Sequence, residues 1–339
     1  MKTLFRLLIY LSLVAESAYA ATEPWPQYQP TQTTSGVVRL SGNSEMKALV
    51  LRWTSGFQKY HPSVRFETHL TGTDTGMAAL YTSKADLALL GRAPTANEIQ
   101  AFEWVFRYKP AQVEVMTGSL NQAGKSPALV VFVHHDNPLK RLTVAQLEAI
   151  YGTEHQLSSG NIRTWGELGL SGEWANKPIN LYLPDAMSGT GRFFRHVVLN
   201  DSRMMNWAQL TEFHDTSVVG RETHDAGHQI ISALAQDRFG MAIGSLDSAN
   251  EKVRPVALSA SDSTDQLDAT RENLISRKYP LSRVVLACYN RKPGTPVDPA
   301  VREFLLYVLS REGQQEIPQV GSYLPLTAAN SADQSRKLD

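Results

Sequence analysis

The chain has 339 residues, and its 33 basic residues balance 33 acidic ones. A chain of this length exceeds what one simple core supports, so we expect two lobes. The lack of a net positive field argues against nucleic-acid binding and against binding to anionic membranes. We interpret the single cysteine, Cys288, as a small buried hydrophobe rather than a reactive thiol, because it lies in the apolar run RVVLACYN.

The N-terminus has the three-part pattern of a secretory signal. Lys2 and Arg6 precede an apolar run over 7–14, and Ala18-Tyr19-Ala20 provides the small residues that a signal peptidase reads. We therefore predict a signal peptide over 1–20, followed by an irregular, proline-containing lead-in over 21–36 that takes no part in the core. No cysteine follows the cleavage point to carry a lipid, and no later apolar run reaches the roughly 18 residues of a membrane span.

Short β-branched runs then alternate with longer segments of helical periodicity, which predicts an α/β fold. Apolar residues at helical spacing predict helices around 46–57, 193–198, 230–234 and 301–309. The first of these should end at His61-Pro62, because proline interrupts the helical hydrogen bonds. The predicted strands are Val37–Leu40, Val64–Leu70, Asp86–Leu90, Ala128–His134, Ile179–Leu183, Gly240–Ile243 and Val284–Tyr289.

Three junctions between a predicted strand and the next helix are rich in glycine and hydroxyl residues. They are SGNS at 41–44, TGTDTG at 71–76 and SGTG at 188–191. Each alone is typical of an ordinary helix N-cap. Three together favour an anion site, because ligands of open α/β sheets bind where strands end and helix N-termini present unpaired N–H groups. The two interpretations stay open on this pattern alone.

Several longer motifs occur in a defined order. They are SGNSEMKALVLRW, THLTGTDTGMAAL, ADLALLGRAPTANEIQAFE, ALVVFVHHDNPLKRLTVAQLEAIYG, RTWGEL, SGTGRFF, KYPLSRVVLACYNRKPGTPVDPAVREFLLYVLSREGQ and GSYLPL. In this order they resemble the periplasmic phosphate-binding component of bacterial phosphate ABC transporters, a type II periplasmic binding protein. The resemblance runs from about Val37 to Leu326.

The resemblance implies a two-lobed Venus-flytrap fold, each lobe a mixed sheet flanked by helices. Lobe one would hold 37–127 and 283–326, lobe two 128–282, and 327–339 would form a tail. It also implies a monomeric, non-enzymatic periplasmic receptor without cofactor or metal, which binds phosphate or a similar oxyanion by lobe closure and delivers it to an inner-membrane ABC permease.

Carried onto this sequence, the resemblance implies ligand contacts from both lobes. Backbone N–H groups and hydroxyls at helix starts would hold the oxyanion together with an arginine. Gly91 would accompany the arginine at the end of its strand. The implied binding residues are Asn43, Ser44, Glu45, Thr73, Asp74, Arg92, Ser188, Gly189 and Thr190.

Two positions depart from the family pattern. Pro184 stands where family members usually carry an arginine, four residues before the SGT serine, and Glu45 stands where they tend to carry a hydroxyl. An ionised carboxylate about 4 Å from a unit negative charge would cost roughly 4 kcal/mol at an effective dielectric near 20. Glu45 must therefore point away, be neutral, or accept a hydrogen bond from a protonated oxyanion. Arg92 or Arg192 could replace the missing charge, and the alternative for either is a place on a solvated helix face.

Other functions remain as alternatives. The same fold with another oxyanion or a small organic anion, or a signalling protein that has lost transport, would fit these departures. A hydrolase with Ser188 as nucleophile lacks the GxSxG pattern. His224 and His228 are spaced as metal ligands, but Gly227 disfavours the helix they need. His134 and His135 alternate across a predicted strand, so we expect that they cannot face one ion.

Overall fold

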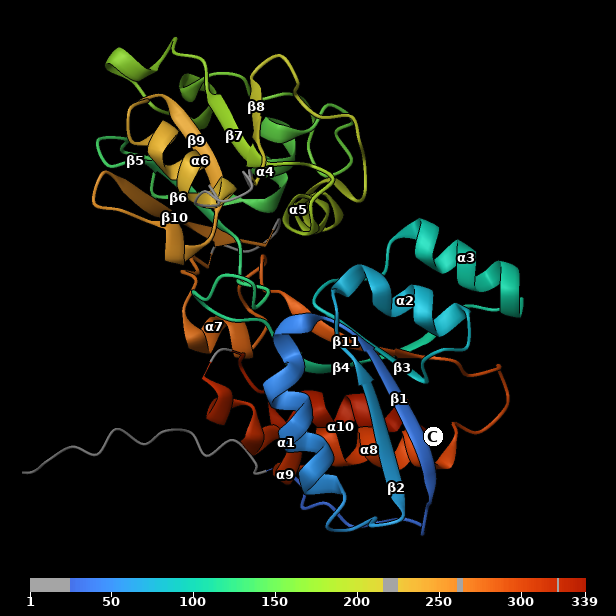
Figure 1. Ribbon diagram of the computed structural model, residues 1–339. Coiled ribbons are helices and arrows are strands. Elements are labelled where there is room, and N and C mark those ends of the chain that lie inside the picture. The colour runs from blue at the N-terminus through green and yellow to red at the C-terminus, as the bar shows by residue number, and fades with distance from the viewer. Residues whose placement is uncertain (1–24, 216–224, 261–264, 322) are drawn as a thin grey trace, which may run out of the picture.

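The computed structural model describes residues 25–215, 225–260, 265–321 and 323–339. The predicted signal peptide over 1–20 and the first residues of the lead-in lie outside this described part. The chain forms two lobes, each with its own sheet (Figure 1). This confirms the predicted α/β fold class, with two mixed sheets flanked by helices. No helix in the described part is long and apolar enough to span a membrane.

The first lobe is built on a five-stranded sheet with the order β2-β1-β3-β11-β4. β1 pairs in parallel with β2 and β3, whereas β11 runs antiparallel to both β3 and β4. The sheet is therefore mixed, and the carboxyl ends of β1 and β3 meet at one edge. Its strands are β1 (Gly36–Gly42), β2 (Val64–His69), β3 (Leu87–Leu90), β4 (Ala111–Thr117) and β11 (Val284–Tyr289).

Helices cover both faces of this sheet (Figure 1). On one face, α1 buries Trp53 and Phe57 in the main core, and α8 begins at Pro299 with Asp298 as its N-cap. On the other face, α2 and α3 pack over Leu90 and its neighbours. The helices of this lobe are η1 (Ser44–Met46), α1 (Lys47–Phe57), α2 (Thr73–Tyr81), α3 (Ala96–Phe106), α8 (Pro299–Leu309), α9 (Arg311–Glu316), η5 (Pro318–Val320) and α10 (Ala328–Arg336).

The second lobe is built on a six-stranded sheet with the order β6-β10-β5-β9-β7-β8. β5 runs antiparallel to β9 and β10, while β7 is parallel to β8 and β9. Helices α4 and α5 cover one face and α6 covers the other. The strands are β5 (Val130–His134), β6 (Arg141–Thr143), β7 (Asn180–Pro184), β8 (Leu210–Phe213), β9 (Gly240–Gly244) and β10 (Val253–Ser259). The helices are α4 (Val144–Tyr151), η2 (Trp165–Leu168), η3 (Gly172–Trp174), α5 (Gly189–Leu199), α6 (Ala226–Leu234) and η4 (Leu246–Ser248).

The chain passes between the two sheets twice. It leaves the first sheet after β4 and enters the second at β5, then returns between β10 and β11 by way of α7 (Arg271–Ile275). The lobe boundaries 127/128 and 282/283 stay predictions.

The described part of the lead-in contributes to the core, although the sequence analysis gave it no such role. Tyr28 is 4% exposed and belongs to the main core of the first lobe. Its hydroxyl donates to the buried carboxylate of Glu303 at 2.7 Å and lies 2.7 Å from His61 Nε2. Residues 327–339 likewise form more than a tail, because α10 contacts α8 and β4.

Candidate functional site

A cleft of about 740 Å³ lies between the lobes, where both sheets end. All three predicted junctions contribute to its lining. Asn43, Ser44, Thr73, Asp74 and Arg92 line it from the first lobe. Ser188, Gly189 and Thr190 line it from the second.

The first junction follows β1 and leads into η1. Asn43 is the N-cap of η1, and its Oδ1 accepts a hydrogen bond from the backbone N–H of Glu45 at 2.9 Å. This bond fixes the amide so that Nδ2 lies toward Gly91, 2.9 Å from where a β-carbon on Gly91 would stand. Asn43 is 7% exposed, so the junction presents a buried amide donor beside the cleft.

Glu45 does not line the cleft. Its carboxylate lies 3.1 Å from Lys125 Nζ, and its side chain is 47% exposed. Its backbone N–H donates to Asn43 Oδ1. The structure therefore places Glu45 apart from the other predicted binding residues. The Glu45 carboxylate points away from the cleft, which is one of the three conditions under which the sequence would allow phosphate binding.

The second junction follows β2 and leads into α2. Gly72 precedes the helix and supplies no capping side chain, so the first turn of α2 keeps N–H groups that no side chain caps. Gly76 allows α2 to pack tightly against the sheet, because a β-carbon there would lie 2.7 Å from Leu90 Cδ2 and 3.3 Å from Gly42 Cα. This close packing holds the N-terminus of α2, with Thr73 and Asp74, at the cleft.

Arg92 follows β3 and is 6% exposed, but acidic partners already match its charge. Its Nη1 and Nη2 donate to Glu98 Oε2 and Oε1 at 2.8 and 2.9 Å, and Nη2 also donates to Asp74 Oδ1 at 2.5 Å. Burial alone would lower the pKa of Arg92, but these two carboxylates raise it above its ordinary value. Arg92 thus lines the cleft with its positive charge already compensated by two carboxylates.

The third junction lies in the second lobe, between β7 and α5. Ser188 is the N-cap of α5, and its Oγ accepts from the backbone N–H of Gly191 at 3.0 Å. Gly191 must be a glycine because a β-carbon there would lie 2.2 Å from the carbonyl oxygen of Asp185. Gly189, by contrast, has open space on its cleft side. The start of α5 therefore presents backbone N–H groups and the Thr190 hydroxyl to the cleft.

The sequence analysis assigned no binding role to Arg283, which also lines the cleft. The residue is 6% exposed and stands just before β11, where the chain has returned to the first lobe. Its guanidinium lies over the Phe193 ring of α5 at 5.2 Å, so it touches both lobes. No local pattern marks Arg283, because its Nη2 donates to the backbone carbonyl of Gly91, 192 residues away in the sequence.

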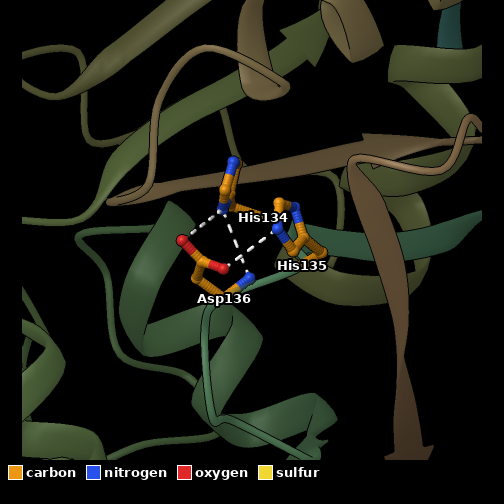
Figure 2. A group of neighbouring side chains, drawn as sticks. All are labelled: His134, His135 and Asp136. Atoms are coloured by element: carbon orange, nitrogen blue, oxygen red, sulfur yellow. Dashed lines mark hydrogen bonds and ion pairs between the residues drawn. The ribbon is translucent and has the colours of Figure 1, made fainter.

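The histidine cluster at the end of β5 corrects one expectation. His134, His135 and Asp136 lie together, with the two rings 4.3 Å apart and their possible ligand atoms within 4.8 Å of one another (Figure 2). The expectation that both histidines cannot face one ion is wrong, because β5 ends at His134 and strand alternation stops there. The Asp136 carboxylate is already paired with Arg238 at 3.1 Å.

The remaining reactive candidates are accounted for by local contacts. His224 lies outside the described residues, and His228 pairs with Asp225 at 3.1 Å. Cys288 is fully buried in β11, and burial raises the pKa of its thiol to about 12. A thiol protonated at neutral pH fits the interpretation of Cys288 as a buried hydrophobe.

Comparison with known proteins places the chain among binding proteins. A family model described as "PBP superfamily domain" matches residues 28–312. The phosphate-binding protein PstS of Pseudomonas aeruginosa is 31% identical over 316 residues, which span 93% of this chain and 91% of that protein. Protein SphX of Synechococcus elongatus is 22% identical over 303 residues, covering 88% of this chain and 80% of that protein.

Two solved structures share the fold. PstS from Borrelia burgdorferi matches with a TM-score of 0.55 at 15% identity, covering 86% of this chain and 99% of that one. An ABC-type phosphate transport receptor from Vibrio cholerae matches with a TM-score of 0.53 at 18% identity, covering 85% and 99%. At these identities the likeness concerns the arrangement of the two lobes.

Proposed function

The chain belongs to the PBP superfamily, in the family of the phosphate-binding protein PstS, and we propose that it binds inorganic phosphate between its two lobes. In this proposal it delivers the anion to an ABC permease. The lobes comprise 37–127 with 283–326, and 128–282, and they close on the ligand by rotation about the two passages between the sheets.

One observation carries the proposal: the N-termini of two helices, one from each lobe, line the same cleft. α2 contributes Thr73 and Asp74, and α5 contributes Ser188, Gly189 and Thr190. The N-terminal N–H groups of a helix carry partial positive charge, so two such ends facing one anion stabilise it without a full counter-charge. Thr73 and Thr190 add hydroxyl donors that can hydrogen-bond a tetrahedral oxyanion.

This arrangement suits holding an anion and gives no support to a hydrolase. A nucleophilic serine requires a base within hydrogen-bond reach. Ser188 Oγ instead accepts the N–H of Gly191, and among the described residues it has no histidine partner. His214, which also lines the cleft, lies 3.2 Å from Asp185. We therefore assign the protein no catalytic activity.

Export and partnership belong to the same proposal. The pattern over 1–20 supports secretion to the periplasm without a lipid anchor, and the family supports delivery to an inner-membrane permease by a monomeric receptor. The other oxyanions, small organic anions and the non-transport role are the alternatives that the binding experiment must separate.

Isothermal titration calorimetry tests this function. The protein from Ala21 onward would be unfolded and refolded to remove bound anion, then titrated with phosphate and, separately, with sulfate at neutral pH. We expect saturable one-to-one binding of phosphate at micromolar affinity or tighter, and no comparable heat with sulfate. Equal binding of both anions would favour a different oxyanion as ligand, and no heat with either would favour the non-transport role.

A further inference from the structure

Arg283 is a buried cation whose hydrogen-bonding capacity is largely unused. Its Nη2 donates to the carbonyl oxygen of Gly91 at 3.2 Å, and its Nε is buried with no partner. No carboxylate lies within ion-pairing distance of it in the described part of the chain. A buried charge without a partner is costly, so an arginine in this state indicates that something outside the chain completes its surroundings.

The other arginines near the cleft differ in this respect. Arg92 is held by Asp74 and Glu98. Arg195, on α5, is 8% exposed and has no carboxylate pair among the described residues either, but its N–H groups donate to the backbone carbonyls of Ala186, Ser202 and Asp201. Arg195 therefore has the partners of a structural arginine, and it does not line the cleft.

Further polar side chains line the cleft close to Arg283. Around Gly91, a β-carbon would stand 2.5 Å from Ser126 Oγ, 2.9 Å from Asn43 Nδ2 and 3.8 Å from Thr73 Oγ1. The Ser126 hydroxyl donates to the same Gly91 carbonyl as Arg283, at 2.8 Å. These contacts leave no room for a β-carbon, so the position must be glycine, and the cleft wall beside it carries an amide, hydroxyls and the Arg283 guanidinium. Such a set recognises the oxygens of an anion.

We propose that Arg283 is the cationic ligand of the anion bound in the cleft, and that it meets the anion at the part of the cleft wall that Gly91 and Ser126 also line. This inference rests on the proposed function, because it requires an anion in the cleft. It assigns the charge to a residue at the passage between the lobes, where it touches α5 through Phe193, so the contact with the anion would form as the lobes close.

The protonation state of Arg283 fits this role. Burial lowers its pKa to about 10; the nearby Tyr323 acts to raise this pKa and the Arg92 charge acts to lower it further. The guanidinium is still protonated at neutral pH, and an anion beside it would raise its pKa again. A lysine at this position would have a lower pKa than the arginine, because its ordinary value is lower and the same burial acts on it.

Titration calorimetry with phosphate on R283Q, R283K and R195Q tests the assignment, with thermal unfolding of each ligand-free protein. R283Q should lose about 30-fold or more in affinity, as expected when one member of a buried charged pair is removed. R283Q should not melt below the wild type, because the unpaired charge is gone. R195Q should behave in the opposite way, with a lower melting temperature and an unchanged phosphate affinity.

R283K keeps the charge, so it should bind phosphate more tightly than R283Q at pH 7. Between pH 7 and 9 R283K should lose phosphate affinity as the lysine loses its proton, whereas the wild type should not. Phosphate affinity of R283Q within threefold of the wild type would overturn the assignment while leaving the proposed function in place. If the wild type does not bind phosphate, the affinities of the same variants are measured for whichever of sulfate, arsenate or molybdate raises the melting temperature of the wild type. A wild type that binds none of these anions would overturn both.

Discussion

Replacing Arg92 with methionine should destabilise the protein through Glu98 rather than through Asp74. The Arg92 and Glu98 side chains are 7% and 17% exposed and are joined by two hydrogen bonds, whereas Asp74 is 84% exposed. An exposed partner contributes about 0–1 kcal/mol. Removing one member of a buried pair costs about 3–5 kcal/mol, since the other charge stays buried. Glu98 keeps its hydrogen bonds from Thr95, so we expect about 3 kcal/mol.

The loss should depend on pH in a defined direction. Burial alone would raise the pKa of Glu98, but the hydrogen bonds from Arg92 and Thr95 hold it below its ordinary value. A carboxylate with a depressed folded-state pKa stabilises the protein above its unfolded pKa, and this contribution is lost as the pH falls through the folded value. In R92M, Glu98 can take up a proton at acid pH. The difference between wild type and R92M should therefore shrink from pH 7 to pH 4.

Urea unfolding of phosphate-free protein, followed by tryptophan fluorescence, measures this. The double variant R92M/E98Q should recover most of the loss at pH 7, because no buried charge is left unpaired. A cost for R92M below about 1 kcal/mol, or a double variant as unstable as R92M, would refute the assignment of the Arg92 charge to Glu98.

Three further changes probe the cleft, each read by phosphate titration. T190A removes one hydroxyl donor and should weaken binding by about 1–2 kcal/mol without lowering the melting temperature; an unchanged affinity would place the anion elsewhere. G91A puts a methyl group 2.5 Å from Ser126 Oγ and 2.9 Å from Asn43 Nδ2, so it must displace these cleft-lining groups and should cost about tenfold or more in affinity; wild-type binding would contradict an anion held at this part of the cleft wall. E45T should change affinity less than about threefold, since Lys125 pairs with that carboxylate; markedly tighter binding would show that the Glu45 charge opposes the anion.

Much of the fold follows from residue patterns, and two of the unpredicted strands, β10 and β6, have physical explanations. β1 and β11 stand out as apolar β-branched runs, and α1 by its buried stripe. β10 contains Pro255, which argues against a strand. The structure accommodates it because β5 pairs with Val253–Val256 and β6 only with Ala257–Ser259, so the backbone of Pro255 faces a neighbouring strand on one side. β6 has only three residues and depends on β10 for its pairing.

The candidate site could be predicted where the signal is local in sequence. A glycine and hydroxyl junction after a strand places a helix N-terminus at the sheet edge, and all three junctions do line the cleft. The Glu45 carboxylate pairs with Lys125, 80 residues further on, and no local pattern shows this contact. Arg283 depends in the same way on Gly91 in a distant strand connection. Charge pairing across the fold is what the sequence does not reveal.

A crystal structure of the phosphate-bound protein would test the central claim most directly. We expect one phosphate ion with the two lobes closed around it. The ion should contact Thr73 at the start of α2, Ser188 to Thr190 at the start of α5, and the Arg283 guanidinium. A phosphate bound by one lobe alone, or a phosphate away from both helix N-termini, would contradict the claim that the two lobes hold the anion between them.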